Sequence, residues 1–152
     1  MWSKVRVEDE GLLTQCAEMF SQANPSVLTV DVATLRSGIA HGAVEVFHYA
    51  GAGFEAVLEF LFSPRRARYL VCTAFRGVVE AGEVLDQIVV KGQEFVQQHQ
   101  QPELYALRPT GVPVSPLTQL YDLLLQDARL LVNVEGRTSD SDLWRIRAGG
   151  AP

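Results

Sequence analysis

The segment of this sequence best placed to do chemistry is a short turn at residues 76–82. It reads Arg76-Gly77-Val78-Val79-Glu80-Ala81-Gly82. A continuously apolar stretch at 68–75 precedes the turn, and a strongly periodic helical pattern follows it. Free N–H groups at a helix N-terminus carry partial positive charge, so a strand, a tight turn and a helix start often hold a phosphate. The turn therefore predicts an anion site, beside which Glu80 places a negative charge.

A histidine on a predicted strand is a second candidate for chemistry. Strand alternation puts His48 on the same face as Val44 and Val46. An imidazole with an ordinary pKa of about 6.5 can accept a proton at neutral pH. The alternative is a packed, hydrogen-bonded histidine without a catalytic role.

Composition limits the classes of partner. The chain has 152 residues, of which 47% are hydrophobic, so it can form a packed core as one domain. Its net charge of -5 argues against nucleic acid as the main partner. The arginine cluster Arg65, Arg66 and Arg68 could bind a phosphate or an acidic partner, or be only solvated. Cys16 and Cys72 are typical of small buried side chains in a reducing compartment, and no spacing predicts a metal site.

No signal-peptide core and no apolar run of membrane length occurs, so we expect a soluble protein without membrane contact, cytoplasmic or packaged within a virion. The motifs of common hydrolases, P-loop enzymes, zinc proteases and dinucleotide-binding folds are also missing.

Hydrophobic periodicity predicts alternating strands and helices. Strands are expected at 3–7, 43–49, 54–62, 68–75, 103–108, 130–134 and 143–147, and helices at 12–23, 31–39, 81–99 and 116–125. Thr29 or Asp31 could cap the second helix, and Ser115 the last. We expect an α/β (α+β) domain at 1–147 with a mixed, mostly antiparallel sheet flanked by helices, and a C-terminal tail at 148–152.

This element order, β-α-α-β-β-β-α-β-α-β-β, together with the turn at 76–81, resembles the GNAT superfamily of N-acetyltransferases over residues 3–147. In that family a loop of pattern (Arg or Gln)-x-x-Gly-x-(Gly or Ala) binds the pyrophosphate of acetyl-CoA. Arg76 and Ala81 match the pattern, but Val79 stands where the family has glycine. A branched side chain there would strain the backbone by about 1–3 kcal/mol and occupy space needed by the anion. Acetyl-CoA binding is therefore expected to be weak or lost.

The resemblance also implies site residues. The cofactor-binding set would be Cys72, Thr73, Ala74, Phe75, Arg76, Gly77, Val78, Val79, Ala81 and Gly82. Tyr121 resembles the family's general acid, the alternative being an ordinary tyrosine whose hydroxyl lies at the surface. Glu59, Glu55 and His48 are the candidate bases. The Gly-Phe pair that often follows the tyrosine is replaced by Leu125-Gln126.

Two functions follow as expectations. The first is a non-catalytic pseudoenzyme on this fold that acts as a structural, assembly or binding module, for example a virion protein of a tailed bacteriophage, with a protein partner or self-association. The alternative is an acetyl-CoA-dependent N-acetyltransferase that acts on an amine. A dimerising domain that senses a metabolite is compatible with the acidic charge.

Overall fold

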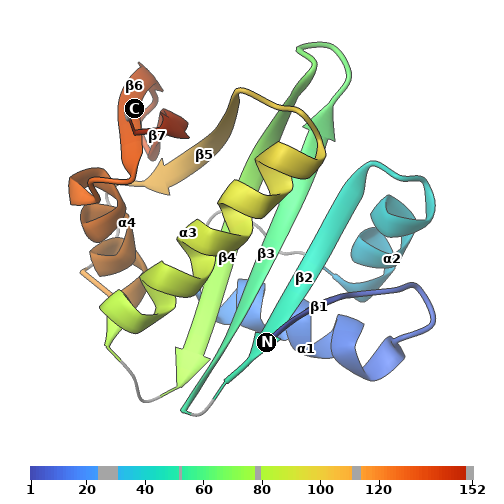
Figure 1. Ribbon diagram of the computed structural model, residues 1–152. Helices are drawn as coiled ribbons and strands as arrows, with labels where there is room; N and C mark the ends of the chain where they lie inside the picture. Colours follow the sequence, from blue (N-terminus) through green and yellow to red (C-terminus); the bar gives the residue numbers. More distant parts are fainter. Residues whose placement is uncertain (24–30, 52, 78–79, 111–113, 150–152) are drawn as a thin grey trace.

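The computed structural model contains one seven-stranded sheet with helices against both of its faces (Figure 1). It describes residues 1–23, 31–51, 53–77, 80–110 and 114–149. The strands are β1 (Trp2–Lys4), β2 (Val44–Ala50), β3 (Phe54–Ser63), β4 (Arg68–Gly77), β5 (Glu103–Pro109), β6 (Leu130–Arg137) and β7 (Ser141–Ala148). The helices are α1 (Glu10–Ala23), α2 (Val32–Ala40), α3 (Ala81–Gln98) and α4 (Pro116–Gln126). The predicted element order and fold class are confirmed, and the sheet runs one residue past the predicted domain end at 147.

The strands lie in the order β1-β2-β3-β4-β5-β7-β6, and every neighbouring pair is antiparallel except β4–β5. In the part of the chain that the structure describes, β4 and β5 pair only at Leu70↔Tyr105 and Val71↔Ala106. Beyond Val71 the two strands separate, and β5 turns away from β4 (Figure 1). The sheet is therefore open at the point where its one parallel pair ends.

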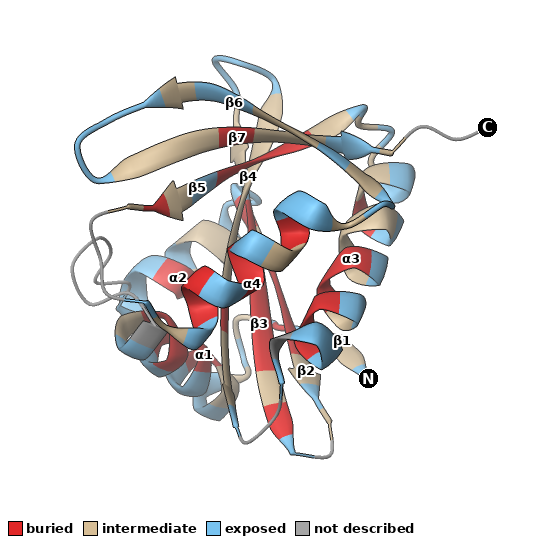
Figure 2. Cartoon of the chain, turned by 90° about the vertical axis from the view of Figure 1, so that its left-hand side faces the viewer, coloured by how far each residue is buried: buried red, intermediate tan, exposed pale blue. Residues whose placement is uncertain are grey.

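Strand alternation divides the core into two layers, because successive side chains point to opposite faces. Phe47, Leu58 and Phe60 pack under α3 and α4, in the layer that also contains Phe95. The other layer lies under α1 and α2. It consists of Val5, Leu13, Cys16, Ala17, Met19, Phe20, Leu35, Val44, Val46, Val57 and Ala74. Figure 2 shows buried residues along β3 and on one side of α3.

Two helices begin at the predicted caps. Asp31 Oδ1 accepts a hydrogen bond from the Thr34 backbone N–H at 2.7 Å, while the alternative cap, Thr29, lies outside the described residues. At the start of α4, Ser115 and Thr118 exchange side-chain and backbone hydrogen bonds in a capping box. Both caps satisfy N–H groups that the helix itself leaves without partners.

Candidate functional site

The predicted cofactor strand forms one wall of the β4–β5 opening. Cys72, Thr73, Ala74 and Phe75 follow Val71, the last residue of β4 that pairs with β5. Because side chains alternate, Cys72 and Ala74 join the α1/α2 layer and Phe75 packs against the α3/α4 layer. The structure thus places this stretch where a ligand could enter between two strands.

The second residue of the predicted anion turn has to be glycine. Gly77 has φ +130°, and a Cβ built there would collide with the Gly53 carbonyl oxygen and lie 2.6 Å from Phe54 Cα. Val78 and Val79 lie outside the described residues, as does the side chain of Ala81. The expected effect of Val79 on the turn therefore stays a prediction.

The first turn of α3 presents negative charge. Glu80 is the N-cap residue but makes no side-chain capping hydrogen bond, and Glu83 lies in the first turn. Both residues are exposed, and a Cβ added at Gly82 would meet open space. The backbone N–H groups of this turn attract anions, whereas the two carboxylates repel them.

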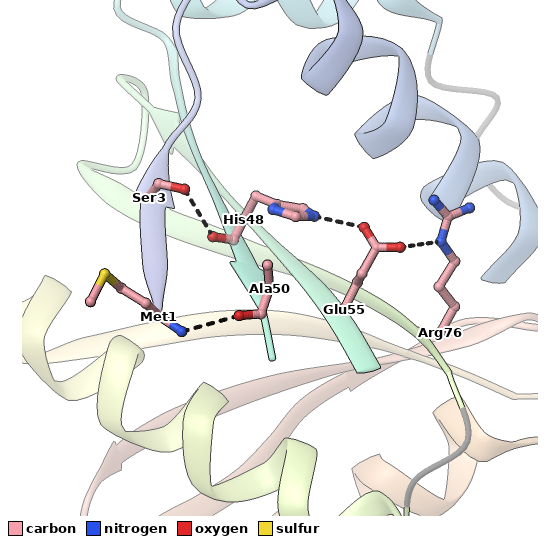
Figure 3. A network of polar contacts seen from close by, with 6 residues as sticks. All are labelled: Met1, Ser3, His48, Ala50, Glu55 and Arg76. Carbon is pink, nitrogen blue, oxygen red and sulfur yellow. Dashed lines mark hydrogen bonds and ion pairs between the residues drawn. The ribbon is translucent and has the colours of Figure 1, made fainter. Parts of the chain in front are cut away.

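The Arg76 side chain lies on the α1/α2 face of the sheet instead of reaching toward α3. Its Nε donates to Glu55 Oε1 at 2.9 Å, and Glu55 Oε2 lies 2.9 Å from His48 Nε2 (Figure 3). His48 is buried, while the side chains of Glu55 and Arg76 are 28% and 33% exposed. One carboxylate thus joins two candidate site residues into a polar chain across three strands.

The pKa values of the two glutamates on this face of β3, Glu55 and Glu59, are shifted in opposite directions. Hydrogen bonds from His48 and from Arg76 hold the pKa of Glu55 below its ordinary value, against the effect of burial. Burial raises the pKa of Glu59, which favours its neutral form. Glu59 is therefore the better candidate of the two for a carboxyl group that takes up a proton.

Neither cysteine is set up as a nucleophile. Burial raises the pKa of both thiols to about 12, and the Glu55 carboxylate adds to the effect at Cys16 as Glu59 does at Cys72. The thiolate is the reactive form, so both residues are expected to stay protonated and inert at neutral pH. They act as packing residues, as the sequence predicts.

Tyr121 is buried, so the expectation of a hydroxyl at the surface is wrong. Its side chain is 5% exposed and its ring meets that of Trp144 edge-on, with 5.6 Å between centroids and 86° between planes. Burial and, to a lesser degree, the nearby Cys72 thiol raise the pKa of Tyr121 well above its ordinary value. Tyr121 lies on α4 and contributes to the wall of an apolar cavity. It is held in its protonated form, the state from which a general acid acts.

The candidate acid and bases lie in different layers. Glu59 and His48 share the α1/α2 face of β3 and β2, where Glu59 is opposite Val46 and His48 is opposite Val57. Tyr121 belongs to the α3/α4 layer. The sheet therefore lies between Tyr121 and the two candidate bases.

Two features of the site were missed by sequence reasoning. Glu55 and Arg76 are direct cross-strand partners. Counting the register of the β3–β4 hairpin outward from the turn after Ser63 would have paired these two residues. The second feature is a cavity of about 460 Å³ between α3, α4, β5 and β7. No sequence signal identifies it, because its walls come from residues far apart in the chain.

Neither a metal site nor a membrane span is found in the described ranges. No three His, Cys, Asp or Glu residues there come together as ligands for a metal ion. No helix among them is both long and apolar enough to cross a bilayer.

Comparison with known proteins gives a match of fold alone. No family model matches the chain, and no curated protein sequence does. The crystal structure of an N-acetyltransferase from Staphylococcus aureus Mu50 superposes with a TM-score of 0.58 and 12% sequence identity, over 97% of this chain and 96% of that chain. The chain therefore has the fold that the sequence resemblance implied, the N-acetyltransferase (GNAT-like) fold.

Proposed function

We propose that this protein is a non-catalytic binding or assembly module built on the N-acetyltransferase fold. The observation that carries this proposal is the charge at the start of α3. Glu80 and Glu83 stand at the first turn, while the matching arginine, Arg76, is bound by Glu55 on the other face of the sheet.

A diphosphate carries at least two negative charges, and a helix N-terminus contributes only about half of one positive charge. Proteins usually complete such a site with Lys or Arg side chains. The first turn of α3 instead carries Glu83 and follows Glu80, and repulsion by these two carboxylates opposes binding. Ligand loss at this turn leaves the fold intact, because its core lies elsewhere.

The proposed partner is a protein, either a second copy of this chain or a neighbour in an assembly such as a bacteriophage particle. Support comes from β6, which lies at the edge of the sheet and pairs with β7. Leu131 and Val134 on this strand are 50% and 43% exposed, and Leu107 on β5 is 37% exposed. Open strand edges with apolar side chains favour pairing with another chain.

Titration of acetyl-CoA and free coenzyme A, followed by thermal unfolding and calorimetry, tests the proposal. A ligand at one hundred times its Kd stabilises a protein by about 2.7 kcal/mol, which would raise the Tm of a domain of this size by roughly 5–10 °C. We expect no rise at millimolar ligand, and a clear rise would overturn the proposal.

Two variants separate the reasons for a lack of binding. If the carboxylates are responsible, the double variant Glu80→Gln/Glu83→Gln should gain coenzyme A binding. If the side chain at position 79 is responsible, Val79→Gly should gain it. Gain in neither variant would mean that the turn was assigned to the wrong segment.

The second candidate is an acetyl-CoA-dependent N-acetyltransferase, which the β4–β5 opening and the protonated Tyr121 favour. In this mechanism an amine attacks the thioester carbonyl, its proton passes to Glu59 or His48, and Tyr121 protonates the departing thiolate. Tyr121→Phe should then lower kcat at least tenfold with little change in KM. Acetyl transfer that is unchanged in this variant would remove Tyr121 from the mechanism.

A further inference from the structure

The cavity between α3 and α4 is separate from the turn that would hold a diphosphate. Its volume is about 460 Å³. The α3 residues along its wall begin at Ile88, which lies about two helical turns beyond the start of α3 at Ala81. Its wall also includes Thr73 and Tyr121, so a ligand here would lie beside the β4–β5 opening but away from the anion turn.

The inner walls of the cavity are apolar. Residues of β3 and β4 line it on one side, and residues of α3, α4, β5 and β7 line the rest. Leu58, Phe60, Val89, Leu104 and Leu124 contribute to these walls. Pockets of roughly 300–1,000 Å³ with mainly apolar walls are typical binding sites for small molecules.

The polar side chains gather where α3 ends and β5 begins. Gln97, Gln101, Glu103 and Arg147 line this part of the cavity. In the described part of the chain, the hydrogen bond of the Arg147 side chain runs from Nε to Glu103 Oε2 at 2.9 Å, so its terminal nitrogens can still donate. The Arg147 side chain is 43% exposed, as a residue at the mouth of a cavity should be.

We propose that this cavity binds a medium-chain fatty acid, with the hydrocarbon tail among the apolar walls and the carboxylate at Arg147. Arg147 would then bind two carboxylates: Nε keeps its hydrogen bond to Glu103, and the terminal nitrogens donate to the fatty acid, as the fork of a guanidinium allows. The Gln97 and Gln101 amides can supply further hydrogen bonds to the same head group.

The volume of the cavity limits the length of the hydrocarbon tail that it can hold. If a methylene takes about the volume of one liquid water molecule, ~30 Å³, then 460 Å³ holds roughly fifteen such groups at most. An acid of about ten to fourteen carbons leaves room for imperfect packing. Acetate or butyrate would leave most of the apolar wall without contacts.

Calorimetric titration with hexanoate, octanoate, decanoate and decanol provides the test. Because each methylene transferred from water adds a constant increment, affinity should rise about fourfold per carbon, or roughly two-hundred-fold from hexanoate to decanoate. Decanol should bind more weakly than decanoate, and Arg147→Gln should remove that difference. Affinity that does not depend on chain length would overturn the proposal.

A variant at Gly92 and a control at another glycine test whether the ligand binds in the cavity. It lies on α3 in the cavity wall, and a Cβ added there would meet Leu104 Cδ1 at an ordinary 3.8 Å. Gly92→Leu should fill the cavity and abolish decanoate binding, while the fold is kept because leucine favours the helix. Gly11→Ala, at an open position of α1 outside the cavity wall, should bind decanoate like the parent chain.

If Gly92→Leu binds decanoate as tightly as the parent, the acid sits elsewhere on the surface and the proposal is wrong. This outcome is distinct from the coenzyme A experiment, because the two titrations use different ligands and different variants.

Discussion

Nε of Arg76 donates a hydrogen bond to the Glu55 carboxylate at 2.9 Å, and the two residues face each other directly across the β3–β4 pair. The contact keeps the arginine on the α1/α2 face of the sheet, away from α3. Strand alternation already puts residue 76 on the same face as Cys72 and Ala74, and the hydrogen bond holds its charge there.

Glu55→Gln should make the protein less stable at neutral pH and less sensitive to acid. The folded-state pKa of Glu55 is lowered, chiefly by the His48 hydrogen bond, below its ordinary value of 4.5. Its contribution is therefore complete above that value and is lost as the pH falls through the lowered folded pKa. We expect the variant to lose about 1 kcal/mol at neutral pH, because the pair is partly exposed.

Urea unfolding across the acid range would measure this effect. Glu94→Gln, on the exposed side of α3, is the matched control and should follow the parent curve. A Glu55→Gln curve as steep in acid as that of the parent would contradict the assigned pairing.

Glu59→Gln should have the opposite effect. Burial raises the folded-state pKa of Glu59 above its ordinary value of 4.5, so its favourable contribution is complete below that value and disappears as the pH rises through the folded pKa. Glutamine removes the cost of a buried charge, so the variant should gain on the order of 1 kcal/mol at neutral pH. Thermal unfolding at acidic and at neutral pH measures the gain. A loss of stability at neutral pH would mean that the charged form has a partner.

Phe95→Ala should be among the most damaging single changes in the core. The Phe60 and Phe95 rings stack with centroids 3.8 Å apart and planes at 7°, which joins α3 to β3. Loss of a buried phenyl ring costs about 3–5 kcal/mol. Urea denaturation of Phe95→Ala, compared with the control Val90→Ala at a half-exposed position of the same helix, measures the difference. Equal stability of the two variants would show that α3 is not packed through this pair.

Gly77→Ala should destabilise the end of β4. Its φ of +130° and its close approach to Gly53 and Phe54 leave no room for a methyl group. We expect a cost of at least about 2 kcal/mol by thermal unfolding, because strain and a steric clash add. Gly82→Ala is the control and should be neutral or slightly stabilising. A tolerated Gly77→Ala would mean that the turn has another conformation.

Much of the fold could be predicted from the sequence because the signals are local. Alternation with a period of two correctly placed Glu55 and Glu59 on one face of β3 and Phe60 on the other. Turn residues and helix caps such as Ser115 marked where elements begin. These features depend on neighbouring residues, so a short window of sequence contains them.

The candidate site depended on contacts between distant segments. The opening beyond Val71, the burial of the α4 residue Tyr121 and the cavity near Gly92 all require the helices and strands to pack together. The sequence alone determined the order of the elements and the direction of their side chains, since periodicity is a local property. Only the tertiary structure decided that Arg76 meets Glu55 and that an apolar space lies between α3 and α4, because such contacts arise from packing over long separations in the chain.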